Sequence, residues 1–316
     1  MVLAVTFPGQ GSQQVGMGKA LAEAFPEARA VFEEVDDALG EKLSSVIFEG
    51  PEERLTLTAN TQPALMAVSI AAIRALQARG FDMAQRASFV AGHSLGEYSA
   101  LCAAGSLSVA NTARLLRIRG NAMQAAVPPG KGAMAAIIGL EQDVVEQACT
   151  DASVSGVCQI ANDNGGGQLV ISGSRAEVEH ACELLKERGA KRAIALPVSA
   201  PFHSALMAPA AEAMREALAG VDVLAPCVPL VANVTARPIV DPAEIRSRLV
   251  EQVTGRVRWR ESVEWMADPA CGGVDRFVEI GGGKQLGGML RGNAPASEQV
   301  TLNVPADLEA FAKSLG

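Results

Sequence analysis

The feature that most constrains this chain is a glycine-flanked serine between an apolar strand and a helix. The segment FVAGHSLGEYSALCAAG, residues 89–105, carries the pattern G-x-S-x-G at Gly92, Ser94 and Gly96. In that context the serine lies on a sharp turn that pushes its hydroxyl beyond the carboxyl end of the strand. Free N–H groups at the start of the following helix favour a developing oxyanion. We interpret Ser94 as a catalytic nucleophile; the alternative is an ordinary strand-to-helix turn.

Strand-like and helix-like segments alternate along much of the chain, which predicts an α/β fold. Residues 2–7 form a short apolar run that predicts a buried strand. Residues 58–80 predict a long buried helix. We expect Thr61 to cap this helix, with Pro63 in its first turn and Gly80 at its end. Aromatic residues make up only 4% of the chain, and the aliphatic surplus is typical of parallel strands covered by helices.

The pattern changes between residues 131 and 198. Six segments there have the character of strand, helix, strand, strand, helix and strand, in that order, which is the signature of a ferredoxin-like unit. The chain has 316 residues, whereas a single compact domain rarely exceeds about 250–300. We therefore expect an α/β-hydrolase-like parallel-sheet core formed by residues 1–130 and 199–316. A ferredoxin-like small domain is expected as the insertion 131–198.

Composition and charge disfavour several classes of protein. Asp and Glu total 35 against 27 Lys and Arg, so the formal charge is −8, which disfavours a nucleic-acid binder. The six cysteines form no C-x-x-C pair and no Cys/His cluster with zinc spacing, so we expect reduced thiols and no metal site. The first residues carry no basic leader, and no apolar run reaches the roughly 18 residues of a membrane helix. We expect a monomeric cytoplasmic protein with no membrane partner.

A serine nucleophile needs a base, most often histidine, and the chain has three histidines. His93 is adjacent to the serine, and neighbouring side chains on that turn diverge. His180 lies on a predicted helix of the small domain. His203 follows a strand end, where α/β folds place their ligand crevice. Elimination makes His203 the expected base, against the alternative of a loop histidine without a catalytic role.

No acid that could orient this histidine stands out. Asp222 and Asp241 follow His203, which breaks the usual hydrolase order of Ser, Asp, His. Asp163 fits the order but lies in the predicted small domain. A backbone carbonyl is the remaining possibility for holding the imidazole ring.

Two further glycine-rich loops do not fit nucleotide binding. FPGQGSQQVGMG has Gln14 where a dinucleotide fingerprint needs its third glycine, and it lacks the Gly-Lys-Ser/Thr of a phosphate loop. Its exposed N–H groups suit half of an oxyanion hole. For FVEIGGGKQLGGML we favour a packing role over ligand contact.

These motifs together resemble the malonyl-CoA:acyl-carrier-protein transacylases of bacterial fatty-acid synthesis. The resemblance runs from Val5 to about Leu290 and rests on FPGQGSQ, TQPAL, GHSLGEYSAL, RGNAMQ, PVSAPFHSALM and neighbouring stretches. It extends to acyltransferase domains of polyketide synthases and to the transacylase subunit of malonate decarboxylases. The resemblance implies that Ser94 is the acyl nucleophile and His203 the general base. It further implies that the main-chain carbonyl of Gln252 orients the histidine, and that the amides of Gln10 and Leu95 form the oxyanion hole.

The resemblance also implies how the substrate is recognised. Arg119, in LLRIRGNAMQ, matches the arginine that binds the malonyl carboxylate, and a guanidinium is the best planar partner for such a group. The alternative role for Arg119 is that of an ordinary arginine on a helix surface. Phe202 resembles the malonyl-selective pattern of related domains. Gly281-Gly282-Gly283 stands where many members have Gly-Pro-Gly, so we expect a more flexible loop there.

The implied reaction is ping-pong covalent catalysis through a malonyl-serine ester, with no metal and no bound cofactor. Malonyl-CoA and the phosphopantetheine arm of the acyl carrier protein are substrates. The carrier is acidic, so docking needs local positive charge. Four residues resemble the docking positions of the family, against the alternative of ordinary solvated charges: Lys191, Arg192, Lys284 and Arg291.

Three other functions stay open at this point. A serine hydrolase would share the turn and the base, although neutral acyl substrates need no buried cation. A non-catalytic carrier-protein binding module would not need an intact Ser94 and His203. A transacylase that serves malonate decarboxylase is barely separable from the sequence alone.

Overall fold

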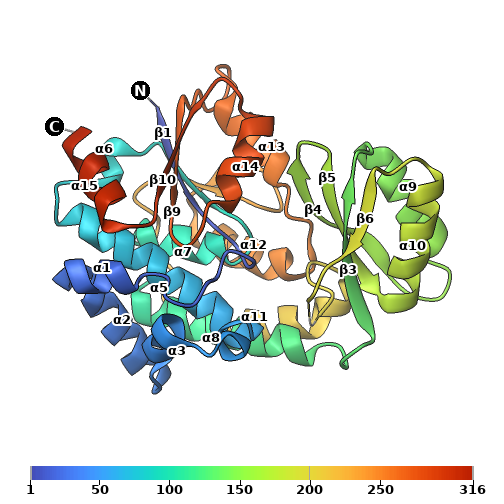
Figure 1. The fold of residues 1–316 in the computed structure, drawn as a ribbon, viewed down its shortest axis with the longest axis horizontal. Helices are drawn as coiled ribbons and strands as arrows, with labels where there is room; N and C mark the ends of the chain where they lie inside the picture. Colours follow the sequence, from blue (N-terminus) through green and yellow to red (C-terminus); the bar gives the residue numbers. More distant parts are fainter. Residues whose placement is uncertain (1, 199, 315–316) are drawn as a thin grey trace.

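Two β-sheets organise the computed structural model, which describes residues 2–198 and 200–314. The middle of the chain forms a small four-stranded unit beside a larger unit built around six strands (Figure 1). The α/β expectation with a parallel-sheet core is confirmed. None of the helices within the described ranges is long and apolar enough to cross a membrane.

The large sheet has the strand order β10-β9-β1-β2-β7-β8. Its first five strands in that order are parallel, and β8 pairs antiparallel with β7 at one edge. Its strands are β1 (Leu3–Phe7), β2 (Phe89–Gly92), β7 (Leu230–Ala232), β8 (Arg237–Ile239), β9 (Arg276–Ile280) and β10 (Glu298–Leu302). Since β1 and β2 are neighbours, the loops after both strands meet at one edge of the sheet.

Helices cover both faces of this sheet because its strands are apolar on both sides. In β1, Leu3, Val5 and Phe7 enter the main core, whereas Ala4 enters a second core with Phe277. The main core is covered by α1 (Lys19–Ala24), α2 (Pro26–Leu39), α3 (Leu43–Glu49), α4 (Glu52–Leu55), α5 (Thr58–Gln77), α6 (Met83–Arg86), α7 (Gly96–Ala103), α8 (Val109–Ala125), α11 (Ala208–Ala219), α12 (Pro242–Thr254) and α15 (Pro305–Ser314). The second core is covered by α13 (Trp259–Ala267) and α14 (Gln285–Asn293).

The expected N-cap of α5 is wrong. The helix begins at Thr58, three residues before Thr61, so Pro63 lies in its second turn rather than its first. The Thr61 hydroxyl donates a hydrogen bond of 2.6 Å to the Leu55 carbonyl oxygen, so it anchors the helix to α4 instead of accepting an N–H. Gly80 follows the helix with a φ of 89°, as a helix-ending glycine does.

The small sheet has the strand order β4-β5-β3-β6 and is antiparallel throughout. Its elements follow one another as β3 (Gly132–Ile138), α9 (Gln142–Ala152), β4 (Cys158–Gly165), β5 (Gln168–Ser174), α10 (Arg175–Glu187) and β6 (Arg192–Ala195). This is the expected ferredoxin-like order. The separate cores support our proposed division at 1–130, 131–198 and 199–316, although positions 1, 199, 315 and 316 lie outside the described residues.

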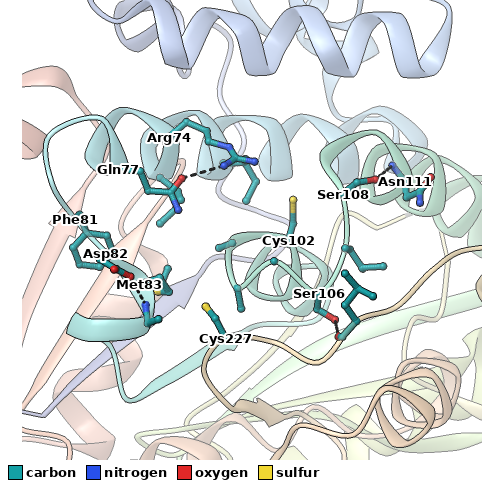
Figure 2. Close-up of a pocket in the computed structure, with 18 of the residues that line it drawn as sticks. Arg74, Gln77, Phe81, Asp82, Met83, Cys102, Ser106, Ser108, Asn111 and Cys227 are labelled. Atoms are coloured by element: carbon teal, nitrogen blue, oxygen red, sulfur yellow. Dashed lines mark hydrogen bonds between the residues drawn. The ribbon is translucent and has the colours of Figure 1, made fainter.

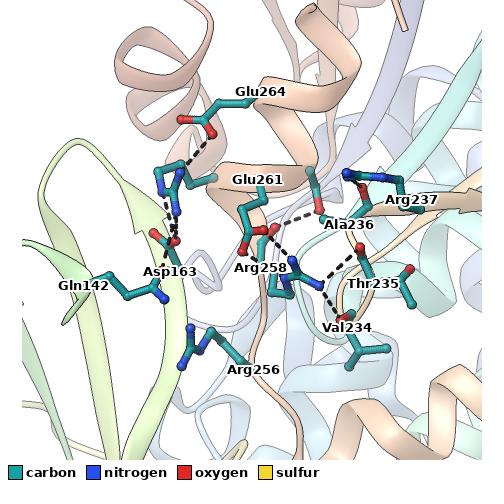
Figure 3. A network of polar contacts seen from close by, with 12 residues as sticks. Gln142, Asp163, Val234, Thr235, Ala236, Arg237, Arg256, Arg258, Glu261 and Glu264 are labelled. Carbon is teal, nitrogen blue, oxygen red and sulfur yellow. Dashed lines mark hydrogen bonds and ion pairs between the residues drawn. The ribbon is translucent and has the colours of Figure 1, made fainter. Parts of the chain in front are cut away.

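The small sheet is joined to the large unit through the backbone of β4. The Asp163 N–H donates to the Val257 carbonyl oxygen (2.9 Å), and the Val257 N–H donates to that of Ala161 (2.8 Å). The buried Asp163 carboxylate also pairs with Arg260 of α13 at 2.8 Å (Figure 3). The segment joined in this way directly follows α12, which contributes to the site described next.

Candidate active site

Ser94 lies on a left-handed turn between β2 and α7, with a φ of 54°. That conformation is rare for a residue with a side chain, and strain of this kind clusters at functional sites. The flanking glycines are required by space. A Cβ on Gly92 would lie 1.9 Å from the Gly96 carbonyl carbon, and a Cβ on Gly96 would lie 2.4 Å from the Phe7 carbonyl oxygen. The turn therefore fits only against β1 and with glycine on both sides of the serine.

Asn233, which directly follows β7, holds this strained turn in place. Its Oδ1 accepts the Ser94 N–H at 2.8 Å, and its Nδ2 donates to the Gly92 carbonyl oxygen at 2.7 Å. The Asn233 N–H in turn donates to Oε1 of Glu97 at 2.7 Å. Both Asn233 and Glu97 are buried, so these bonds do not compete with water.

His203 is the base candidate that lies beside the serine. Its Nε2 lies 2.7 Å from the Ser94 Oγ. Its Nδ1 lies 2.8 Å from the Gln252 carbonyl oxygen and 3.1 Å from that of Gly255. Since carbonyl oxygens only accept, Nδ1 carries the proton and the Nε2 lone pair faces the serine hydroxyl.

None of the three acids considered from the sequence bonds to His203. Asp163 pairs with Arg260, and Asp241 caps α12 by accepting the Glu244 N–H at 2.8 Å. Asp222 is exposed. The hydrogen bonds of His203 Nδ1 therefore run to backbone carbonyls.

Burial is the main cause that lowers the pKa of His203, to about 3, and the positive charge of Arg119 acts in the same direction. The imidazole is consequently neutral near pH 7, which is the form that accepts a proton. The other two histidines do not compete for this role. The His93 Nε2 lies 2.9 Å from Oδ1 of Asn164 in the small sheet, and His180 is exposed on α10.

Arg119 of α8 is buried at 1% exposure and points at the serine. Its Nη2 donates to the Ser94 Oγ at 3.1 Å and to Oε1 of Gln252 at 2.8 Å, and its Nη1 donates to Oε1 of Gln62 at 2.8 Å. Among the described residues no carboxylate lies within ion-pair distance of this guanidinium. A buried cation without an anion is costly, so this one is suited to an anionic substrate group.

The loop after β1 packs against the turn. A Cβ on Gly9 would lie 2.7 Å from the His93 carbonyl oxygen. The backbone N–H groups of Gln10 and Leu95 have no acceptor within the described ranges. Both are therefore free to donate to an oxyanion.

Among the described residues, the remaining sequence candidates make no side-chain hydrogen bond with Ser94 or His203. Phe202 is half-buried and packs against both the main core and a small cluster around Met134, Ala161 and Val170. The four basic docking candidates are exposed. Lys191 directly precedes β6 and Arg192 begins it, whereas Lys284 directly precedes α14 and Arg291 lies in the last turn of that helix.

Several polar side chains of the site were not found from the sequence. They are Gln62, Glu97, Asn164, Asn233 and the side-chain amide of Gln252. Gln62 and Glu97 stand within the quoted motifs TQPAL and GHSLGEYSAL, which was the available signal. Asn164 lies near the end of β4, Gln252 lies within α12 and Asn233 directly follows β7, and no local pattern marks their side-chain contacts with the site.

A separate cavity of about 820 Å³ lies at the carboxyl-terminal ends of α5 and α7 (Figure 2). Its lining includes Cys102 and Cys227 but none of the serine, histidine and arginine described above. Burial raises the pKa of Cys102 to about 11, so this thiol is a poor nucleophile at neutral pH. Within the described ranges no cluster of three or more His, Cys, Asp or Glu side chains could hold a metal ion.

Comparisons with known proteins agree with this geometry. Residues 5–280 match the family model described as an acyl transferase domain. The chain is 45% identical over 314 residues to the malonyl CoA-acyl carrier protein transacylase of Bacillus subtilis, covering 99% of this chain and 97% of that protein. A solved acyl-carrier-protein S-malonyltransferase from Bartonella henselae superposes with a TM-score of 0.97 at 59% identity, over the full length of both chains. A type II PKS acyl-carrier protein in complex with its malonyl-transacylase matches with a TM-score of 0.94 at 40% identity, covering 99% of this chain and 100% of that one.

The glycines of the turn generate a first prediction. Gly96→Ala should lower the free energy of unfolding by about 1–3 kcal/mol, because its Cβ must displace the Phe7 carbonyl. It should also slow sulfonylation of Ser94 by phenylmethanesulfonyl fluoride by about 100-fold, since the hydroxyl moves. The control is Gly220→Ala, whose Cβ meets nothing closer than 3.6 Å. Equal labelling rates in the two variants would contradict the steric argument.

The buried histidine generates a second prediction. Because its folded-state pKa is about 3, the neutral base persists below pH 6.5, and the sulfonylation rate should change less than about twofold between pH 8 and pH 5. An ordinary imidazole would lose roughly tenfold per unit below its pKa. The unfolded chain gains the proton first, so the free energy of unfolding falls as the pH drops from about 6.5. Circular dichroism defines the range in which the fold is intact, and a rate midpoint near pH 6.5 would refute the assignment.

Proposed function

Because the chain belongs to the malonyl-CoA:acyl-carrier-protein transacylases of the acyl transferase family, we propose that it moves a malonyl group from malonyl-CoA to the phosphopantetheine thiol of an acyl carrier protein. The observation that carries this proposal is the buried Arg119 guanidinium, whose Nη2 lies 3.1 Å from the Ser94 Oγ and which forms no ion pair with any carboxylate in the described part of the chain. It supplies a partner for the free carboxylate that distinguishes malonyl from neutral acyl groups.

In the first half-reaction Ser94 Oγ attacks the thioester carbonyl while His203 Nε2 takes its proton. The tetrahedral oxyanion accepts hydrogen bonds from the backbone N–H groups of Gln10 and Leu95. Collapse breaks the carbon–sulfur bond, and the imidazolium returns its proton to the departing CoA thiolate. The Gln252 carbonyl holds the imidazole by its Nδ1–H throughout.

In the second half-reaction the carrier's phosphopantetheine thiol replaces CoA. His203 takes the thiol proton, the thiolate attacks the malonyl ester, and Ser94 leaves with that proton. A neutral imidazole suits both directions, because it must accept and release one proton in each half-reaction.

The Arg119 guanidinium orients the malonyl carboxylate during both steps. Phe202 is proposed to fill the space beside the malonyl α-carbon. Such a wall discriminates against one extra methyl group by only about 1–3 kcal/mol, so it sets a preference rather than an absolute barrier.

The product, a malonyl thioester on the carrier, is the form used in fatty-acid chain elongation. Both thiols arrive as substrates, so the proposed cycle includes no bound cofactor. We further propose that the protein acts as a cytoplasmic monomer, without a nucleic-acid or membrane partner. The solved complex of a related malonyl-transacylase with its acyl-carrier protein supports the choice of partner.

The central test is direct malonylation. The purified protein, incubated with malonyl-CoA and no added cofactor, should gain one malonyl group at Ser94, detected by intact mass and peptide mapping. Ser94→Ala should gain none, whereas the exposed-residue control Ser45→Ala should be labelled fully. Addition of a phosphopantetheine-bearing carrier should then transfer the group. Release of free malonate instead, or labelling at another residue, would indicate a hydrolase or a different nucleophile.

The docking residues are tested by charge reversal. Lys191→Glu combined with Arg192→Glu should lower the rate of transfer to the acidic carrier, relative to the rate of Ser94 malonylation, by about tenfold at low salt. The matched control reverses two exposed lysines on α1 and α15, Lys19→Glu and Lys313→Glu, and should leave this ratio within about twofold. If reversing the charges of Lys191 and Arg192 leaves the ratio of transfer to malonylation unchanged, these two residues are not part of the docking surface.

A further inference from the structure

Glu97 is a buried carboxylate that the mechanism above does not use. It follows Ser94 by three residues on α7 and is 1% exposed. Its Oε1 accepts the Asn233 N–H at 2.7 Å, and its Oε2 accepts an N–H from Nε2 of Gln252. Both oxygens thus face N–H donors, which favour the ionised, acceptor-only carboxylate, whereas burial opposes ionisation and raises the pKa of Glu97 to about 8.

The neighbouring Gln252 amide has one orientation that fits its surroundings. Its Nε2 faces three acceptors: Oε2 of Glu97, the Ser94 carbonyl oxygen at 2.9 Å and Oδ1 of Asn233 at 3.5 Å. Its Oε1 faces Nη2 of Arg119 at 2.8 Å, and a guanidinium can only donate. Exchanging the amide oxygen and nitrogen would turn N–H groups toward the guanidinium and an oxygen toward three acceptors.

We propose that Glu97 is a positioning residue whose carboxylate fixes the orientation of the Gln252 amide, and through that amide holds the Arg119 guanidinium ready for the malonyl carboxylate. The inference rests on the proposed function and names a determinant of its substrate charge selectivity.

The chain of hydrogen bonds from Glu97 through the Gln252 amide to Arg119, called the relay below, explains why this carboxylate lies near the arginine without pairing with it. Glu97 and Arg119 are not within ion-pair distance, and the Gln252 amide lies between them, bonded to both. A direct ion pair would compete with the substrate carboxylate for the same N–H groups. The intervening Gln252 amide lets Glu97 fix the position of the guanidinium. Because the carboxylate does not touch the guanidinium, the positive charge stays available to the substrate.

The test is Glu97→Gln, a substitution of nearly equal shape that introduces an NH₂ group. That group can satisfy itself only by turning the Gln252 amide, which then presents N–H groups to Arg119. Rates of Ser94 acylation are measured with malonyl-CoA and with acetyl-CoA, which lacks the carboxylate. We expect kcat/KM for malonyl-CoA to fall about 10–100-fold, mainly through KM, and the malonyl-to-acetyl ratio to fall about tenfold, because acetyl-CoA has no carboxylate for Arg119 to bind.

The matched control is Glu279→Gln. Glu279 is also buried and accepts the N–H groups of Leu286 and Gly287 at 3.0 and 2.9 Å, away from Arg119. It should change the melting temperature but not the malonyl-to-acetyl ratio. If Glu97→Gln fails to fold, Gln252→Met removes the relay while keeping the main-chain carbonyl that holds His203, and should lower the same ratio.

A double-mutant cycle isolates the route of the effect. In an Arg119→Ala background the added Glu97→Gln should leave the malonyl-to-acetyl ratio unchanged, because the relay has nothing to hold. Equal losses with both substrates, or a further loss of the ratio in the Arg119→Ala background, would overturn the proposal. Absence of malonyl-Ser94 in the unmodified protein would instead count against the proposed function itself.

Discussion

The left-handed turn at Ser94 is the constraint on which the rest of the site depends. It brings the serine hydroxyl out between two strands, and it exists only because Gly92 and Gly96 leave room for the backbones of α7 and β1. The turn is held from outside by the Asn233 side chain, which bonds to the chain on both sides of the strained residue. The geometry of the nucleophile is therefore a property of the parallel sheet as a whole, since β1, β2 and β7 must be neighbours for these contacts to form.

The electrostatic potential of the site is positive because the direct hydrogen-bond partners of the buried Arg119 guanidinium are uncharged groups. Arg119 is held by the amide oxygens of Gln62 and Gln252 and by the serine hydroxyl. Each of these accepts a hydrogen bond without cancelling the charge, so the guanidinium remains attractive to an incoming carboxylate. The same buried charge disfavours protonation of His203, and so one arginine contributes both to substrate recognition and to keeping the base neutral.

Local patterns in the sequence predicted the parts of the structure that local interactions determine. The strand–turn–helix at Ser94 and the strand and helix order of residues 131–198 follow from apolar spacing and glycines, and both are present. His203 was reached by elimination among three histidines, which was possible only because there are so few. Asn233 and Asn164 could not be found this way, because their contacts with the turn depend on which distant segments of the chain pack beside it. The capping role expected of Thr61 failed for a different reason: the helix begins three residues earlier, at Thr58, and the Thr61 hydroxyl donates to the Leu55 carbonyl oxygen of α4.

Main-chain hydrogen bonds join the ferredoxin-like insertion directly to the segment that holds the catalytic histidine. Through Ala161 and Asp163, β4 pairs with Val257, only a few residues after the carbonyls that grip the imidazole of His203. The Gln159 side chain of the same strand accepts the Ala205 N–H at 3.0 Å, just past that histidine. The insertion is thus not a dispensable module. Removing the insertion would take these bonds away from the segments on both sides of the proton acceptor, even if the remaining sheet still folded.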